Sequence, residues 1–184
     1  MYEEILEKML TPLRLKHSYC VATQAQHLAK IYGEDENKAQ IAGLIHDITK
    51  ELSEDEQREI ISQAGVILDE IQSVSPKLLH SISGSIYINK YLNIKDEEII
   101  SAVRYHTTAK LDMTKLEKII YLADFTSSDR DFDDAPYMRE LVDKSLNEGM
   151  IYGLSYVIKE LIDKKSQIHP DTFLAYNYYV KNKK

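Results

Sequence analysis

The chain has 184 residues, of which 43% are hydrophobic and 29% charged, with only six glycines and four prolines, so its composition fits a globular protein and excludes collagen-like and low-complexity chains. Its single cysteine excludes an internal disulfide, and its first residues lack a signal-peptide pattern, which together favour the cytoplasm. The length predicts a single domain over residues 1–184. The net charge of −7 predicts no nucleic-acid partner, and the lack of a long apolar run predicts no membrane span.

Helical periodicity dominates the chain, and no stretch alternates between polar and apolar residues as a half-buried β-strand does. Residues 1–10 form an amphipathic helical pattern. Thr11 and Pro12 mark a helix start, Gly33 marks its end, and Asp35 can cap the next helix. Further helices are expected over about 53–64, 80–92, 96–106, 114–126, 136–147, 149–164 and 170–182, with a short one from Pro76. The predicted fold class is therefore all-α.

Several common active-site motifs are absent from the sequence. It contains neither GxGxxG nor the P-loop pattern GxxxxGKS/T, and neither GxSxG nor HExxH occurs. Gly149 and Gly153 are spaced for close packing of a helix against a neighbour. The polar, acidic segment 126–136 is either a solvated turn or a loop that covers a substrate.

Histidines and aspartates carry the chemical signal. A single histidine is usually a hydrogen-bonded structural residue, and His27, about 80° around the helix from His17, is expected at the surface. His46 and Asp47 follow an apolar run, and Asp124 follows another. Because a carboxylate on an apolar helix face is costly unless it is paired or bound to metal, each aspartate alone indicates either a buried ion pair or a metal ligand.

Taken together, six residues from five predicted helices offer four imidazoles and two carboxylates: His17, His46, Asp47, His80, His106 and Asp124. This is a full set for two metal ions. One carboxylate can bridge two cations about 3.5–4 Å apart, and Asp47 is the natural bridge. Imidazole and carboxylate suit iron, manganese, zinc or nickel.

The order of these residues resembles that of the HD-domain metal-dependent phosphohydrolases. Flanking segments narrow the resemblance to the YqeK-type HD proteins, which are bacterial symmetrical diadenosine tetraphosphate hydrolases. These segments are Gly43–Lys50 (GLIHDITK), Leu78–His80, Arg104–Thr108, Tyr121–Asp124, Arg130–Phe132 and Ile168–Pro170. The resemblance covers about residues 11–178 and implies an all-α HD-domain helical bundle. The chain departs from the family pattern in the 125–136 loop, where Phe125–Asp129 replaces a Glu-Pro-Gly-like turn, and at Ala109, where glycine is common.

The resemblance also implies a di-iron site, with manganese or another transition metal as the alternative. One metal would be held by His17, His46, Asp47 and Asp124. The other would be held by His80 and His106, together with the bridging Asp47. A homodimer is a further expectation from the family.

The implied reaction is symmetrical hydrolysis of diadenosine tetraphosphate to two ADP by a hydroxide that the two metals share. Asp47, Lys50 and Arg130 are the predicted catalytic residues, the two cations neutralising the leaving phosphate. Substrate contacts are expected from Lys50, Arg104, Thr107, Thr108, Arg130 and His169. Structural roles are open for several of them: a surface charge, an ion pair, or a helix entry in the case of His169.

Two other classes of function share this pattern. Another HD phosphohydrolase would act on a deoxynucleoside triphosphate, a guanosine alarmone or a cyclic dinucleotide, and metal ligands alone do not specify which. A nucleotide-binding regulatory module would need no turnover. The flanking motifs favour the tetraphosphatase over the first alternative, and the retention of all six site residues disfavours the second.

Overall fold

The computed structural model describes residues 2–182, so the ends of the domain predicted over 1–184 lie outside the described residues. The described part contains helices and no strand, as predicted. The helices are α1 (Tyr2–Met9), α2 (Pro12–Tyr32), α3 (Glu36–Ile45), α4 (Glu54–Gln63), α5 (Glu70–Val74), the 3₁₀ turn η1 (Pro76–Leu78), α6 (Leu79–Lys90), α7 (Glu97–Tyr105), α8 (Lys115–Thr126), α9 (Ala135–Lys144), α10 (Leu146–Asp163) and α11 (Pro170–Lys181). Among residues 2–182, no helix combines the length and the apolar character that crossing a bilayer requires.

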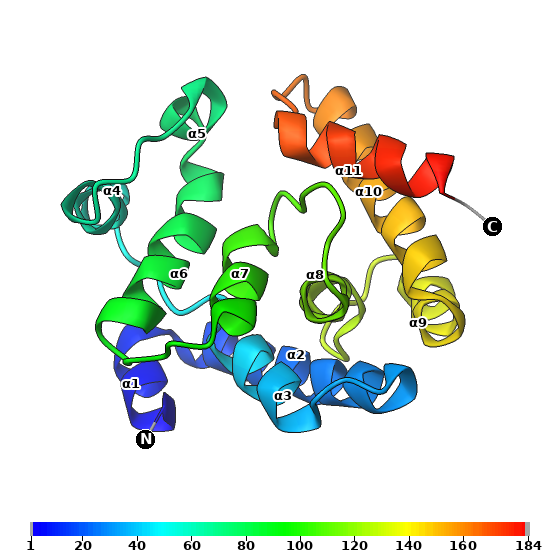
Figure 1. Ribbon diagram of the computed structural model, residues 1–184, viewed down its shortest axis with the longest axis horizontal. Helices are drawn as coiled ribbons and strands as arrows, with labels where there is room; N and C mark the ends of the chain where they lie inside the picture. The colour runs from blue at the N-terminus through cyan, green and yellow to red at the C-terminus, as the bar shows by residue number, and fades with distance from the viewer. Residues whose placement is uncertain (1, 183–184) are drawn as a thin grey trace.

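Helix α8 is the centre of the bundle. Its residues 119–123 are fully buried. In Figure 1 it is seen end-on, with α2 and α3 crossing beneath it, α6 and α7 on one side and α9, α10 and α11 on the other. Asp124 follows the buried run directly, so the core of the protein fixes the position of this carboxylate.

Helices α2 and α3 approach each other unusually closely. A Cβ atom added to Gly43 would lie 2.9 Å from the Cα atom of Ala22, nearer than carbon atoms pack. The predicted caps start both helices: the Thr11 side chain accepts from the amide of Arg14, and the Asp35 side chain accepts from the amide of Lys38. The close approach brings the first half of α2 to the end of α3.

The local signals for helix starts are confirmed at most positions. Ser53 and Thr114 form capping boxes at the starts of α4 and α8. The boundary expected near residue 148 is wrong, because Ser145 adopts an extended backbone and caps α10 three residues earlier. The short helix α5 was not predicted, although Asp69 begins it with a capping box. Within α10, Gly153 packs closely against Met138, as expected.

The segment 126–136 is anchored to the protein. The guanidinium of Arg139 in α9 donates to the carbonyl oxygens of Thr126 at 3.0 Å, Ser127 at 2.9 Å and Arg130 at 2.5 Å. The bond to Thr126 satisfies a backbone acceptor that α8 leaves open at its end, and the other two tie the following loop to α9. The segment therefore holds Arg130 in a fixed place beside the end of α8.

Candidate metal centre

All six residues predicted as metal ligands meet in one place. They come from α2 (His17), the turn after α3 (His46 and Asp47), the start of α6 (His80), the end of α7 (His106) and α8 (Asp124). Three overlapping groups each have ligand atoms within 4.8 Å of one another: His17, His46 and Asp47; His46, His106 and Asp124; and Asp47, His80 and His106. The four imidazoles and Asp47 are buried, so the site excludes most water.

Two of the histidines are held by the same local device. The Nδ1 atoms of His46 and His106 each donate to a backbone carbonyl three residues earlier, Gly43 and Val103, at 2.7 Å. Since a carbonyl only accepts, Nδ1 carries the proton and Nε2 presents a lone pair to the site. Burial lowers the pKa of His46 to about 4, so this ring is neutral at pH 7, as a metal ligand must be.

Asp47 lies between the two groups of histidines. Its Oδ1 atom is 3.3 Å from His80 Nε2 and 3.4 Å from His106 Nε2, and its Oδ2 atom is 3.6 Å from His46 Nε2. Burial acts to raise the pKa of Asp47, but the neighbouring histidines and the Lys50 ammonium outweigh it and hold the pKa well below its usual range. An ionised carboxylate with oxygens facing both groups has the geometry of a bridging ligand.

Asp124 and His17 form the opposite side of the centre. His17 Nε2 lies 3.0 Å from Asp124 Oδ1, and the guanidinium of Arg130 donates to the same oxygen and, at 2.8 Å, to the Asp124 backbone carbonyl. Against the effect of burial, His17 and Arg130 lower the pKa of Asp124. His17 Nδ1 lies 2.8 Å from Asp129 Oδ2, and this second carboxylate fixes the ring so that Nε2 faces the centre.

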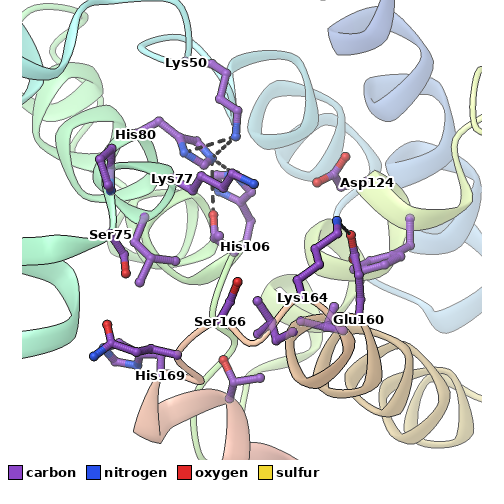
Figure 2. A pocket seen from close by; sticks show the side chains of 18 residues that line it. Lys50, Ser75, Lys77, His80, His106, Asp124, Glu160, Lys164, Ser166 and His169 are labelled. Atoms are coloured by element: carbon purple, nitrogen blue, oxygen red, sulfur yellow. Dashed lines mark hydrogen bonds and ion pairs between the residues drawn. The ribbon is translucent and has the colours of Figure 1, made fainter.

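A cavity of about 470 Å³ opens from this centre. Figure 2 shows its polar lining, with Lys50 beside the histidines and Asp124 across from them. Three lysines line it, Lys50, Lys77 and Lys164, and Lys164 forms an ion pair with Glu160. Apolar lining comes from Leu78, Phe125, Val157 and Leu161. The cavity therefore combines a metal-type cluster with cationic and apolar surfaces.

Lys50 reaches the centre from a turn. Helix α3 ends at Ile45, and the Lys50 amide donates to the Asp47 carbonyl at 2.9 Å. The Lys50 Nζ atom lies 3.1 Å from His80 Nε2, and burial lowers the pKa of this ammonium. Thr107 Oγ1 is 3.3 Å from the same ring nitrogen. Both side chains therefore line the cavity where it meets the metal-type cluster.

Three of the predicted substrate contacts are not on the cavity wall. Arg130 is one of them, and it is held beside the cavity by its bonds to Asp124. Arg104 packs over the ring of Tyr105, with 5.2 Å from its Cζ atom to the ring centroid, and is not on the cavity wall. Two helical positions separate Arg104 from His106, which turns the side chains about 200° apart. Thr108 is buried and donates to the Ala109 carbonyl at 2.9 Å. The structure thus separates Arg104 and Thr108 from the cavity, whereas His169 lines it.

Four residues of the site were not predicted. Arg14 pairs with Asp47 Oδ2 at 3.0 Å, and its place three residues before His17 on one helix was an available signal. Asp129 lies in the loop that departs from the family pattern. Lys77 and Lys164 carry no local signal, because only the tertiary fold brings them to the cavity.

Comparison with known proteins agrees with this geometry. The HD domain family model matches residues 14–129. The chain belongs to the HD-domain family. Two curated symmetrical bis(5'-nucleosyl)-tetraphosphatases, from Bacillus subtilis and Halalkalibacterium halodurans, are each 34% identical to this HD-domain protein, covering 95% of it and 94% and 92% of their own lengths. The resemblance seen in the sequence is therefore confirmed, and with it the all-α HD-domain fold.

A solved structure matches over the whole chain. It is the crystal structure of a predicted HD superfamily hydrolase involved in NAD metabolism from Clostridium acetobutylicum, with a TM-score of 0.96, 36% sequence identity, and coverage of 100% of this chain and 98% of that one. Family membership and the buried cluster of histidine and aspartate together indicate a hydrolase with a divalent metal site.

Proposed function

We propose that this HD-domain protein is a cytoplasmic, single-domain enzyme that hydrolyses diadenosine tetraphosphate at its centre, giving two ADP. The observation that carries the proposal is the buried cluster of four histidines and two aspartates opening onto a cavity lined by three lysines. The curated relatives named as symmetrical tetraphosphatases support the choice of substrate. A homodimer remains a family-based proposal, which light scattering would test.

The residues of the centre fit two metal ions, which we expect to be iron. Two buried atoms that face the cluster, His46 Nε2 and Asp47 Oδ1, have no hydrogen-bond partner within the described protein, and such atoms are costly unless something binds them. His17, His46, Asp47 and Asp124 would hold one ion. Asp47, His80 and His106 would hold the other. When bound, two such ions lower the pKa of a water molecule and stabilise the charge of the reacting phosphate.

The protein's own cations would act on the leaving phosphate. Lys50 and Arg130 approach the centre from two sides, Lys50 beside His80 and Arg130 beside Asp124. Negative charge grows on the departing oxygen, and fixed positive groups stabilise it in a site with little water. The guanidinium of Arg130 keeps its orientation through its two bonds to Asp124. Thr107 would donate its hydroxyl proton to a phosphate oxygen.

Cleavage at the centre of the tetraphosphate requires that both ADP halves are bound. Lys77 and Lys164 line the cavity beyond Lys50. Lys77 would neutralise the half that does not contact the metals, whereas the charge of Lys164 is already balanced by Glu160. Phe125 and Leu161 offer apolar surface to an adenine ring. With positive charge on both sides of the scissile bond, the second phosphorus from either adenosine can occupy the reacting position.

A panel of dinucleoside polyphosphates and nucleotides tests the proposal. The protein, purified without oxygen, is incubated with each in oxygen-18 water, and the products are weighed. We expect ADP as the only nucleotide from diadenosine tetraphosphate, with about half of it carrying one heavy oxygen, because one water attacks each substrate molecule. AMP and ATP as primary products would refute central cleavage. Rapid hydrolysis of a deoxynucleoside triphosphate alone would favour the other HD phosphohydrolases.

Elemental analysis tests the metal assignment separately. We expect close to two metal ions per chain, and loss of activity on chelation. A metal-free protein with full turnover would contradict the assignment, whichever substrate is cleaved.

A further inference from the structure

His169 connects two walls of the cavity. It is the N-cap of α11, where its Nδ1 accepts from the Asp171 amide at 3.2 Å, so the ring proton lies on Nε2. Nε2 donates to Asp69 Oδ2 at 2.8 Å, and the amide nitrogen of Gln72 is 3.2 Å from it. Both ring nitrogens are therefore engaged by the protein, although the side chain lines the cavity.

On the Asp69 side of the Asp69–His169 pair, the chain over residues 62–77 has few packing contacts. Within residues 62–77, which include α5, only Gln72 is buried. A segment with so little buried surface opens easily unless polar contacts hold it. It is tied by the Asp69–His169 pair and by a bond from Arg58 to the Ser73 carbonyl at 2.6 Å. Its last part contributes Ser75 and Lys77 to the cavity.

Helix α11 is a firm anchor for this segment. Thr172, in its first turn, donates to the Thr108 carbonyl at 2.8 Å, which ties α11 to the chain just after His106. Ser166, in the loop that leads into α11, also lines the cavity. Figure 2 shows His169 at the end of the cavity away from Lys50 and Asp124.

We propose that His169 is a positioning residue, which through Asp69 holds the 69–78 segment against α11 and so sets the width of the cavity away from the metal ligands. The proposal rests on the proposed function for its substrate: this part of the cavity would hold the ADP half that leaves. Loosening the segment then weakens substrate binding, while the metal ligands and the reacting phosphorus stay in place.

Two variants remove the pair and keep the caps. His169→Asn retains an oxygen acceptor for the start of α11 but is too short to reach Asp69. Asp69→Asn retains the oxygen that accepts from the Gln72 amide at 2.8 Å but replaces the acceptor for His169 with a donor. The matched control is His27→Asn. It removes another histidine–aspartate pair, to Asp143 at 3.0 Å, which joins α2 to α9 at the surface.

Steady-state kinetics with diadenosine tetraphosphate is the first measurement. Each single variant should raise KM by roughly tenfold, the scale of one charge-assisted hydrogen bond, with kcat within about twofold and metal content unchanged. The KM of the double variant should be no higher than that of the more impaired single variant, because both substitutions remove the same contact. His27→Asn should leave KM within about twofold. Additive effects, or a fall in kcat with loss of metal, would overturn the proposal.

Hydrogen exchange measured by mass spectrometry tests the pair without turnover. Peptides that cover residues 69–78 should exchange faster in both single variants than in the wild type, and at the wild-type rate in His27→Asn. Unchanged exchange in folded variants would overturn the proposal even if the wild type cleaved no nucleotide. Faster exchange in the two variants, combined with a wild type that cleaves no tetraphosphate, would support the pair and refute the proposed function instead.

Discussion

Replacing Gly43 with alanine tests whether the close approach of α2 and α3 builds the metal centre. The added Cβ atom would lie 2.9 Å from Ala22 Cα and 3.1 Å from the Val21 carbonyl oxygen. Unbonded carbon atoms pack at about 3.5–4.0 Å, so the two helices must separate by roughly 0.6 Å or more. Both contacts are with backbone, which cannot rotate away as a side chain would.

The expected cost follows from two opposing effects. Overpacking costs about 1–3 kcal/mol, whereas alanine favours a helix over glycine by about 1 kcal/mol. Gly153→Ala is the matched control, because its Cβ atom would meet the flexible end of Met138 at 3.1 Å and touches no backbone. We therefore expect Gly43→Ala to be less stable than Gly153→Ala by about 2 kcal/mol.

Urea unfolding of the chelated proteins measures this difference without the contribution of bound metal. The separation also moves His46 away from His17, so only Gly43→Ala should lose metal during dialysis. Equal unfolding free energies, or full metal content in Gly43→Ala, would refute the argument that this contact sets the spacing of the ligands.

Three further substitutions test single parts of the centre. Asp47→Ala should lose both metals and His80→Ala mainly one, as elemental analysis would show; equal losses would argue against a bridge. Arg130→Ala should lower kcat/KM by about 10–1000-fold in a folded protein, and an unchanged value would place Arg130 outside the reaction. Asp129→Asn should weaken metal binding by about 10–100-fold, because it loosens the ring of His17. Competition with a chelator of known affinity measures this, and an unchanged metal affinity would contradict the role of Asp129.

The sequence was most informative where local chemistry decides the structure. Ser53 and Thr114 begin helices because their side chains cap amides three residues on, and this is visible in the sequence. The position of Ala109 is also explained. Its φ of 57° lies in the left-handed region, which favours the glycine that is common there in the family.

The sequence was least informative about the cavity. Lys77 comes from a short turn and Lys164 from the end of α10, and no periodicity relates them. Arg104 was predicted from its nearness in sequence to His106, but the helical twist turns it away. Tertiary packing decides which surface side chains share a cavity. Motif spacing therefore finds the buried metal ligands more readily than the side chains around a substrate.

The two histidines that donate to carbonyls of the preceding turn have an electrostatic consequence. Each stands where a helix ends, α3 before His46 and α7 before His106, so two helices direct the negative ends of their dipoles at the same point. Asp47 and Asp124 add two carboxylates there. Lys50 and Arg130 offset part of this negative charge, and bound metal ions would add further positive charge at the same place. For the proposed reaction we therefore expect the affinity for nucleotide to depend on the occupancy of the metal site.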